Sequence, residues 1–279
     1  MYFQTINNKL LEFWQKQGCI CLQPYDIEVG AGTSHTATVL RCLDRNKWNV
    51  VYVQPSRRPS DGRYAENPNR AQHFYQMQVI MMPAPEKIQE ICIESLIKLG
   101  LDLNQHDIRF IESDWENPTL GAWGVGWEMW CDGMEILQFT YMQQIGNIDC
   151  NIPPVEITYG LERLAMYLQN IDSMWDIVWD DSGITYKEIF AKSEIQHCHF
   201  NFIHADTKII MNHYNDYINE ADRLAKLNIT IPAYEYCLKA SHMFNLLDAR
   251  GVIGSTDRPR YITDICHRVR MCCAQWINK

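Results

Sequence analysis

The sequence predicts an α+β fold over residues 1–184 and a helical domain over residues 185–279. Up to about residue 184, segments in which apolar and polar side chains alternate with period two, as in strands, are interspersed with segments of helical period. Beyond that point, three segments repeat apolar side chains every three or four residues, and no strand pattern separates them. We therefore expect strands and helices in the first domain and packed amphipathic helices in the second.

The composition limits the classes of function. The 279 residues are 47% hydrophobic and include nine tryptophans, which is ample for a packed core. A net charge of −9 argues against a broad basic surface for nucleic acid, although local arginines can still bind phosphates. The eleven cysteines are scattered, form no Cys-x-x-Cys pair and follow no secretory signal, so we expect neither disulfides nor zinc. No apolar run approaches the ~18 residues of a membrane span, and we expect a cytoplasmic protein that does not bind a membrane.

The N-terminal region is expected to form a helix, a strand and a glycine-rich turn. Apolar residues recur at helical spacing over residues 3–17, and a glycine ends that helix. Residues 19–23 have the pattern of a strand that a proline stops. In residues 30–35, two glycines precede a Thr-Ser-His cluster, which allows a ligand to approach the backbone closely. No lysine follows, so a plain turn is an equally good interpretation.

The most informative stretch lies between two strand-like segments, residues 48–53 and 73–82. The 17 residues 56–72 contain four arginines and almost no apolar side chains. Loops longer than about 12–15 residues are uncommon unless they are functional or disordered. Two antiparallel strands joined by such a loop would hold cations over a ligand with a phosphate chain. The alternative is a solvated loop on an ordinary hairpin.

The second of these segments has two distinct faces. Period-two alternation gathers the apolar side chains of residues 75–81 on a core face. The other face carries one aromatic ring and two amides, from Phe74, Gln76 and Gln78. A ring above a polar floor suits a ligand with a flat base.

Four further elements are expected downstream: a helix over residues 85–99 and strands over 107–112, 134–144 and 156–159. The intervening segment 114–128 is rich in glycine and tryptophan, which could wall a small pocket or anchor a loop to the core. A helix follows Gly160 directly, and Arg163 lies in its first turn, away from the apolar stripe. Since a helix N-terminus attracts anions, Arg163 there would add a guanidinium for phosphate. The alternative is a salt bridge along the helix surface, but position 167 is a tyrosine.

In order along the chain, these segments resemble the three motifs of class II aminoacyl-tRNA synthetases. The strings GAGTSH, PSRRPSDGRYAENPNR, WENPTLGAWGVGWE, QFTYMQQ, EITYGLERLAMY and FNLLDARGVI more narrowly resemble the alpha subunit of bacterial heterotetrameric glycyl-tRNA synthetase. The resemblance covers nearly the whole chain. It implies a class II synthetase-like antiparallel β-sheet flanked by helices, and a homodimer formed through the first motif, with Pro24 near the interface. Departures such as Ala65 affect none of the arginines.

The resemblance also implies roles for individual residues. Arg57 or Arg58 would bind the α-phosphate of ATP and the amino acid carboxylate, and the spacing does not decide between them. Phe74 would stack on adenine, and Arg163 would bind the γ-phosphate. Glu135 and Gln138 would hold Mg²⁺, although three residues along a regular strand put side chains on opposite faces unless a bulge intervenes. Six side chains are candidates for the glycine site: Thr33, His35, Gln76, Gln78, Trp115 and Thr158.

The implied reaction has two steps. The glycine carboxylate attacks the α-phosphorus of ATP and releases pyrophosphate, and the glycyl group then passes to the terminal ribose of tRNA(Gly). A separate beta subunit would carry most contacts with tRNA in an α2β2 assembly. Two alternatives are a biotin or lipoate ligase on the same fold and an inactive paralogue with a regulatory role. The paralogue should have lost the phosphate-binding arginines, which this chain keeps.

Overall fold

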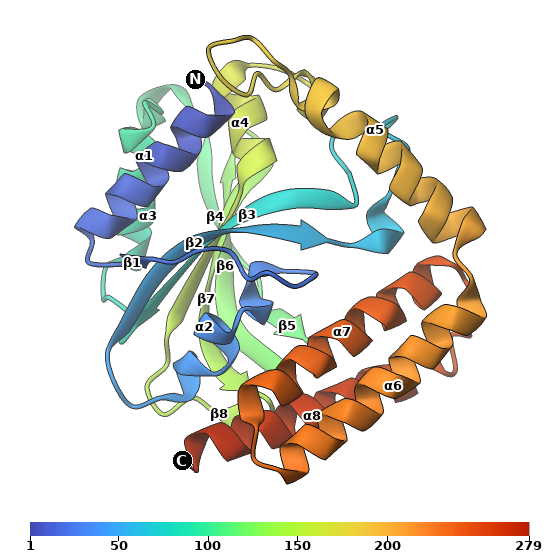
Figure 1. The fold of residues 1–279 in the computed structure, drawn as a ribbon. Helices are drawn as coiled ribbons and strands as arrows, with labels where there is room; N and C mark the ends of the chain where they lie inside the picture. Colours follow the sequence, from blue (N-terminus) through green and yellow to red (C-terminus); the bar gives the residue numbers. More distant parts are fainter. Residues whose placement is uncertain (279) are drawn as a thin grey trace.

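A single large sheet, antiparallel except at one edge, forms the centre of the molecule in a computed structural model that describes residues 1–278 (Figure 1). Its strands follow the order β1-β2-β3-β9-β7-β6-β4, in which only β1 and β2 are parallel. Two short strands are added at its sides, since β5 pairs with β6 and β8 pairs with β7. The strands are β1 Ile20–Cys21, β2 Trp48–Arg57, β3 His73–Met82, β4 Ile108–Glu112, β5 Trp115–Asn117, β6 Ala122–Cys131, β7 Met134–Ile145, β8 Ile148–Asp149 and β9 Val155–Gly160.

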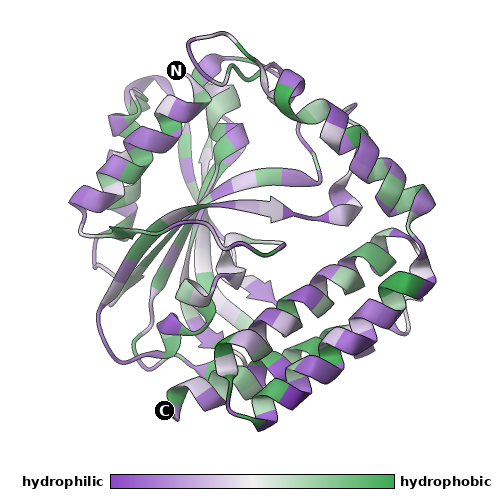
Figure 2. Ribbon diagram, in the orientation of Figure 1, coloured by the Kyte–Doolittle hydropathy of each residue, from purple (hydrophilic) through white to green (hydrophobic). Residues whose placement is uncertain are grey.

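Helices cover both faces of this sheet and bury two apolar cores. The helices are α1 Phe3–Lys16, α2 Thr36–Val39, α3 Ile88–Lys98, α4 Leu161–Gln169, α5 Tyr186–His199, α6 Thr207–Lys226, α7 Thr230–Ala249 and α8 Arg258–Ile277. One core joins the apolar face of β3 to α1, α3 and α4, and the other joins the opposite face of the sheet to α6, α7 and α8. Apolar positions accordingly follow the central strands, while polar ones recur along the helices (Figure 2). The predicted α+β class and antiparallel sheet are confirmed.

Several predicted elements differ in extent. The strand expected over residues 19–23 is reduced to Ile20–Cys21, and the helix expected from Pro85 begins at Ile88. β2 runs past Pro55 to Arg57. Pro55 is tolerated because β1 pairs with β2 only around Val50, which leaves the outer edge of β2 free of ladder bonds at the proline.

The glycine- and tryptophan-rich segment 114–128 is largely strand, which the sequence did not indicate. A side chain at Gly124 or Gly126 would collide with the backbone of β7, so these glycines permit close pairing of β6 and β7. Trp127 stacks on Phe139 in the core, with ring centroids 5.6 Å apart. The segment therefore packs against the core through Trp127, and Trp115 lines a cavity.

The C-terminal region contains the three predicted amphipathic helices, as α6, α7 and α8. It also contains α5, which the sequence analysis missed and which begins at a capping box formed by Thr185 and Glu188. A single π-helical turn, Phe200–His204, follows α5. The division into domains 1–184 and 185–279 stays a prediction. All eleven cysteines are free, and none of the helices in residues 1–278 combines the length and apolar character needed to span a bilayer.

Candidate functional site

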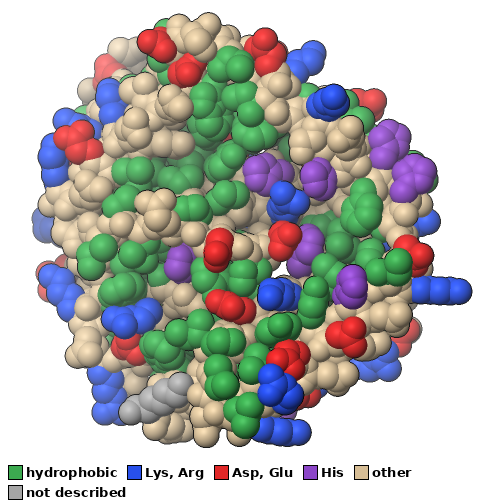
Figure 3. Space-filling view, viewed as in Figure 1, with side chains coloured by type: hydrophobic (Ala, Val, Ile, Leu, Met, Phe, Trp, Pro, Cys, Tyr) green, Lys and Arg blue, Asp and Glu red, His purple; other side chains and the backbone are tan. Residues whose placement is uncertain are grey.

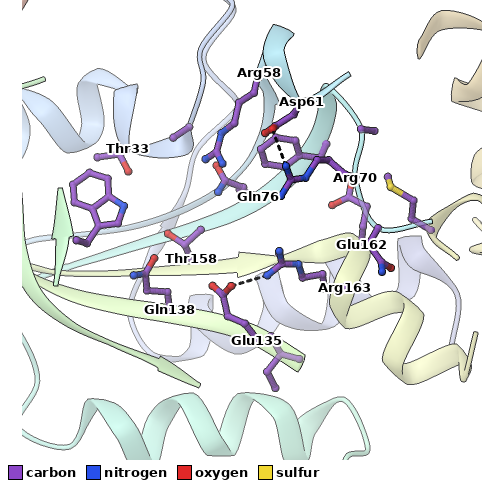
Figure 4. A pocket seen from close by; sticks show the side chains of 18 residues that line it. Thr33, Arg58, Asp61, Arg70, Gln76, Glu135, Gln138, Thr158, Glu162 and Arg163 are labelled. Atoms are coloured by element: carbon purple, nitrogen blue, oxygen red, sulfur yellow. Dashed lines mark hydrogen bonds and ion pairs between the residues drawn. The ribbon is translucent and has the colours of Figure 1, made fainter. Parts of the chain in front are cut away.

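A cavity of about 340 Å³ opens over the polar face of β3, β9 and β7, beneath the arginine-rich loop (Figure 4). Nine of the twelve predicted site residues line it: Thr33, Arg58, Phe74, Gln76, Trp115, Glu135, Gln138, Thr158 and Arg163. Arg57, His35 and Gln78 do not line it. The sequence analysis also overlooked several lining residues, among them Asp61, Arg70, Glu162 and Ile136.

The two candidate arginines of the hairpin point to different places. Arg58 reaches the cavity, where its guanidinium lies 5.0 Å from the centre of the Phe74 ring and its Nε donates to the carbonyl of Gly30 at 2.9 Å. Arg57 pairs in register with His73, on the other face of the hairpin, and its Nη1 lies 3.4 Å from Nε2 of His197. Because neighbouring residues of an extended chain point to opposite faces, Arg57 and Arg58, between which the sequence did not decide, face different cavities.

A bulge brings Glu135 and Gln138 to the same cavity. Along the β6–β7 pair, Trp130 lies opposite Glu135 and Met129 lies opposite Leu137, which leaves one extra residue on β7. That residue, Ile136, is buried. Because an extra residue shifts the alternation by one, both polar side chains face the cavity. The bulge that this pairing required is therefore present.

Three arginines converge on the cavity. Nη1 of Arg163, in the first turn of α4, lies 2.6 Å from Oε2 of Glu135 on β7. Arg70 lies 3.6 Å from Asp61, and both belong to the hairpin loop. Arg163 therefore forms its salt bridge across the cavity mouth rather than along its own helix. The unusual number of arginines in the loop was the only sequence signal for Arg70.

A layer of hydrogen-bonded polar side chains forms the floor. Oε1 of Gln76 accepts from the backbone N–H of Gly32 and from Oγ of Ser56, each at 3.1 Å. Gln78 is fully buried one layer deeper, where its Oε1 accepts from Oγ1 of Thr158 at 3.1 Å. A Cβ at Gly32 would lie 2.6 Å from this same oxygen, so the glycine is required for the turn to approach β3.

His35 has a structural position instead of one in the cavity. Its Nδ1 accepts from the backbone N–H of Ala37 at 2.9 Å and caps α2. Its ring lies between those of Tyr25 and Tyr52, at centroid distances of 4.8 and 4.6 Å. Burial lowers its pKa, which favours the neutral, accepting imidazole. The expected direct contact of His35 with glycine is therefore not supported.

Two buried carboxylates adjoin the floor, and the sequence analysis missed both. Burial raises the pKa of Glu156 and of Glu162 to about 7. Glu162 accepts from the backbone N–H of Tyr75 at 2.8 Å and from the hydroxyl of Tyr186 at 2.9 Å, so it ties α4 to β3 and α5. Glu156 accepts from Oγ1 of Thr33 at 2.5 Å, while its Oε2 is buried without a partner. The sequence did carry one signal for Glu156, because it lies two residues before Thr158 and therefore on the same face of the strand.

A group of side chains that could act as metal ligands lies outside this cavity. The ligand atoms of His106, Cys131 and Asp132 lie within 4.8 Å of one another. The carboxylate of Asp132 accepts from the hydroxyl of Tyr167 at 2.7 Å and contacts His106 at 2.8 Å, so hydrogen bonds already account for the polar contacts of the group. The expectation that the protein binds no zinc stays a prediction.

Comparison with known proteins agrees with the motifs. A model of the family "Glycyl-tRNA synthetase alpha subunit" matches residues 3–279. Curated relatives from two strains of Rickettsia bellii, OSU 85-389 and RML369-C, are each described as "Glycine--tRNA ligase alpha subunit". Each is 52% identical to this chain over 280 residues, which covers 99% of the chain and 97% of the relative.

Among solved structures, two of pyrrolysyl-tRNA synthetase from Desulfitobacterium hafniense show TM-scores of 0.47 and 0.46. Both are 12% identical in sequence and cover 66% of this chain and 76% of their own. This likeness is too distant to bear on the site. The family match and the identity to the relatives, in contrast, extend over almost the entire chain. The chain therefore belongs to the glycyl-tRNA synthetase alpha subunit family, as its motifs predicted.

Proposed function

We propose that the cavity binds ATP and glycine and joins them as glycyl-adenylate, the first step of charging tRNA(Gly). The observation that carries this proposal is the convergence of Arg58, Arg163 and Phe74 on one cavity that also contains Glu135 and Gln138. Cations for a polyphosphate, a ring for a base and oxygen donors for a metal ion are the groups that an ATP site needs.

Within this site, Arg58 binds the α-phosphate and the carboxylate that attacks it. The fork of its guanidinium can hold two oxygens at once, which is what an in-line attack requires. Arg163 binds the γ-phosphate at the start of α4, where the helix N-terminus adds its own partial positive charge. Phe74 stacks on adenine. Arg70, which forms only a long ion pair with Asp61, adds positive charge at the cavity wall.

The donor set of Glu135 and Gln138 fits Mg²⁺, because one carboxylate and one amide oxygen are hard ligands and the bulge puts both at the cavity. These two residues would hold the ion. When bound with ATP, Mg²⁺ supplies positive charge against the phosphate oxygens. The side chain of Glu135 also holds Arg163 in place through their ion pair, so it orients the arginine towards the same phosphates.

Glycine binds deeper in the cavity, between Trp115 and the polar floor. Gln76 and Thr158 line this part directly, and the buried Gln78 holds the hydroxyl of Thr158 in position. The ammonium group of glycine needs an anionic partner, and Glu156 is the buried carboxylate behind Thr33 with an oxygen that lacks a partner. Trp115 and Gln76 are the bulky side chains of this part that would clash with the methyl group of alanine.

No protein nucleophile takes part in this reaction. The carboxylate of glycine attacks the α-phosphorus, and pyrophosphate leaves. The chain contributes by orienting the two substrates and by stabilising negative charge that builds on the phosphate oxygens. Arg58 lies over the Phe74 ring and Arg163 pairs with Glu135, so contacts within the chain hold both guanidinium groups at the cavity.

As an alpha subunit, the chain implies a beta partner and a tRNA substrate. We propose an α2β2 assembly in which two copies of this chain pair through the first motif and the beta subunit carries most tRNA contacts. The charge of −9 supports this division, because tRNA binding draws on many lysine and arginine contacts. We place the protein in the cytoplasm, where free cysteines such as these persist.

An ATP–pyrophosphate exchange assay tests the proposal. Exchange should depend on glycine and on Mg²⁺ and should not occur with alanine or biotin. Exchange driven by biotin would assign the chain to the carboxylate ligases, and no exchange with any of the three would favour a regulatory role. The same assay without and with the beta subunit shows whether the alpha chain activates glycine alone.

A further inference from the structure

A second cavity, of about 320 Å³, lies across the β2–β3 hairpin from the first. It is enclosed by the end of the hairpin, by α5 with its π-helical turn, and by α7. Its polar lining consists of Arg57, Gln72, Gln196, His197, Asn201 and His242. In the space-filling view, histidines gather around a hollow in this part of the surface (Figure 3). None of the roles proposed above uses this cavity.

Positive charge in this cavity is not balanced by an ion pair. Within residues 1–278, Arg57 forms no salt bridge, and no acidic side chain lines the cavity. Nδ1 of His197 lies 2.9 Å from the carbonyl of Ser193, so this ring donates there and its Nε2 accepts from Arg57. The nearby carboxylate of Glu194 is turned away and accepts from backbone N–H groups, including that of Gln72. By contrast, two of the three arginines in the first cavity are paired with carboxylates.

Two histidines close to Arg57, His73 and His242, have lowered pKa values, to which burial contributes most and the charge of Arg57 adds. Burial, followed by the charge of Arg57, lowers the pKa of His73 to about 4. Burial is also the largest cause of the lowered pKa of His242, while the charge of Glu28 opposes it and that of Arg57 adds to it. An anion bound beside Arg57 would relieve this repulsion.

Hydrogen-bond donors are fixed around the same space. Nδ2 of Asn201 donates to Oε1 of Gln72 at 3.2 Å, which leaves the NH2 group of Gln72 as a donor. Asn201 comes from the π-helical turn that follows α5, and such turns are frequent at functional sites. Gln72 and Asn201 are both buried, so their positions are set by packing.

We propose that this cavity is a second phosphate-binding site, in which Arg57 supplies the guanidinium, His197 orients it, and His242 and the amide of Gln72 donate further hydrogen bonds. The phosphate group comes either from the backbone of the tRNA acceptor end or from free phosphate or pyrophosphate, which share this chemistry. The site goes beyond the proposed function, since neither the ATP nor the glycine pocket includes it. It also gives Arg57 a role distinct from that of its neighbour Arg58.

The test measures anion binding while the first cavity is filled. The full chain is saturated with Mg²⁺ and a non-hydrolysable ATP analogue and is titrated in a calorimeter with inorganic phosphate, with pyrophosphate and with an RNA hairpin that ends in single-stranded CCA. We expect at least one of these ligands to bind. Arg57→Gln should weaken that binding at least tenfold, and His242→Gln should weaken it measurably. Arg109→Gln, which removes an exposed arginine on β4, is the charge-matched control and should bind as the wild type does.

The pattern of binding identifies the source of the phosphate. If the RNA hairpin binds in a way that depends on Arg57 and is displaced by phosphate, the site binds tRNA. If only the free anions bind, the site binds phosphate or pyrophosphate. The proposal is overturned if no ligand binds once the ATP analogue is in place, or if Arg57→Gln and Arg109→Gln have equal effects. Thermal melts show whether each variant is folded. If Arg57→Gln does not fold, the effect of His242→Gln on anion binding tests the proposal instead. Glycine-dependent exchange by the wild type, measured in parallel, tests the proposed function separately.

Discussion

Replacing Glu156 by glutamine should make the free protein more stable at high pH and a poorer enzyme. The substitution keeps the shape of the side chain and the bond from Thr33 but removes the buried negative charge. As the folded-state pKa is raised from 4.5 to about 7, the folded protein holds this proton more tightly than the unfolded chain does. Stability is therefore lost as the pH rises from about 4.5 to about 7 and stays low above that.

The size of the effect follows from the shift. At about 1.4 kcal/mol for each pKa unit, a rise from 4.5 to about 7 corresponds to roughly 3 kcal/mol of unfolding free energy lost by the wild type at pH 8. We expect Glu156→Gln to recover about 1–3 kcal/mol at pH 8 and nothing at pH 4.5, because the glutamine also leaves a polar atom without a partner. Loss of a charge-assisted bond to the glycine ammonium, worth about 1.5–3 kcal/mol, should raise the KM for glycine by roughly ten- to a hundredfold.

Two measurements check this prediction. Urea unfolding of the substrate-free chain at pH 4.5 and pH 8 gives the stability difference, and glycine-dependent exchange gives the KM. Glu112→Gln, on the exposed edge of β4, is a matched control that should change neither quantity. The reasoning is refuted if Glu156→Gln leaves the KM for glycine unchanged, or if it stabilises the chain equally at both pH values.

Four other outcomes are expected. Arg163→Ala should abolish exchange yet change the unfolding free energy by less than about 1 kcal/mol, since it breaks only a partly exposed ion pair with Glu135; near-normal exchange would contradict its role. Phe74→Ala should weaken ATP binding more than glycine binding in equilibrium titrations, and equal losses would mark the ring as structural. Deleting Ile136 should remove the bulge, turn Glu135 away from the cavity and raise the Mg²⁺ concentration needed for exchange, and an unchanged requirement would count against the metal ligands. Finally, the purified chain should be a homodimer that charges tRNA only after the beta subunit is added, and efficient charging without it would overturn that division.

The sequence by itself determined the elements that carry the site. Alternation along residues 73–82 separated the polar face of β3, with Phe74 and Gln76, from its core face, and the structure keeps that division. The helical period after Gly160 likewise placed Arg163 in a first turn, off the buried stripe. Such patterns are readable because period and burial are local properties of one element. The family motifs then linked these elements to a single activity.

Only the tertiary structure decided which side chains share a cavity. The choice between Arg57 and Arg58 depended on where β2 ends and what packs on each face of the hairpin. The pairing of Glu135 with Gln138 depended on the register between β6 and β7, which sets the bulge. The link of Glu156 to the cavity depends on its hydrogen bond with Thr33, which belongs to a turn more than a hundred residues earlier in the chain. Register and long-range packing arise from contacts between distant segments, so no single stretch of sequence encodes them.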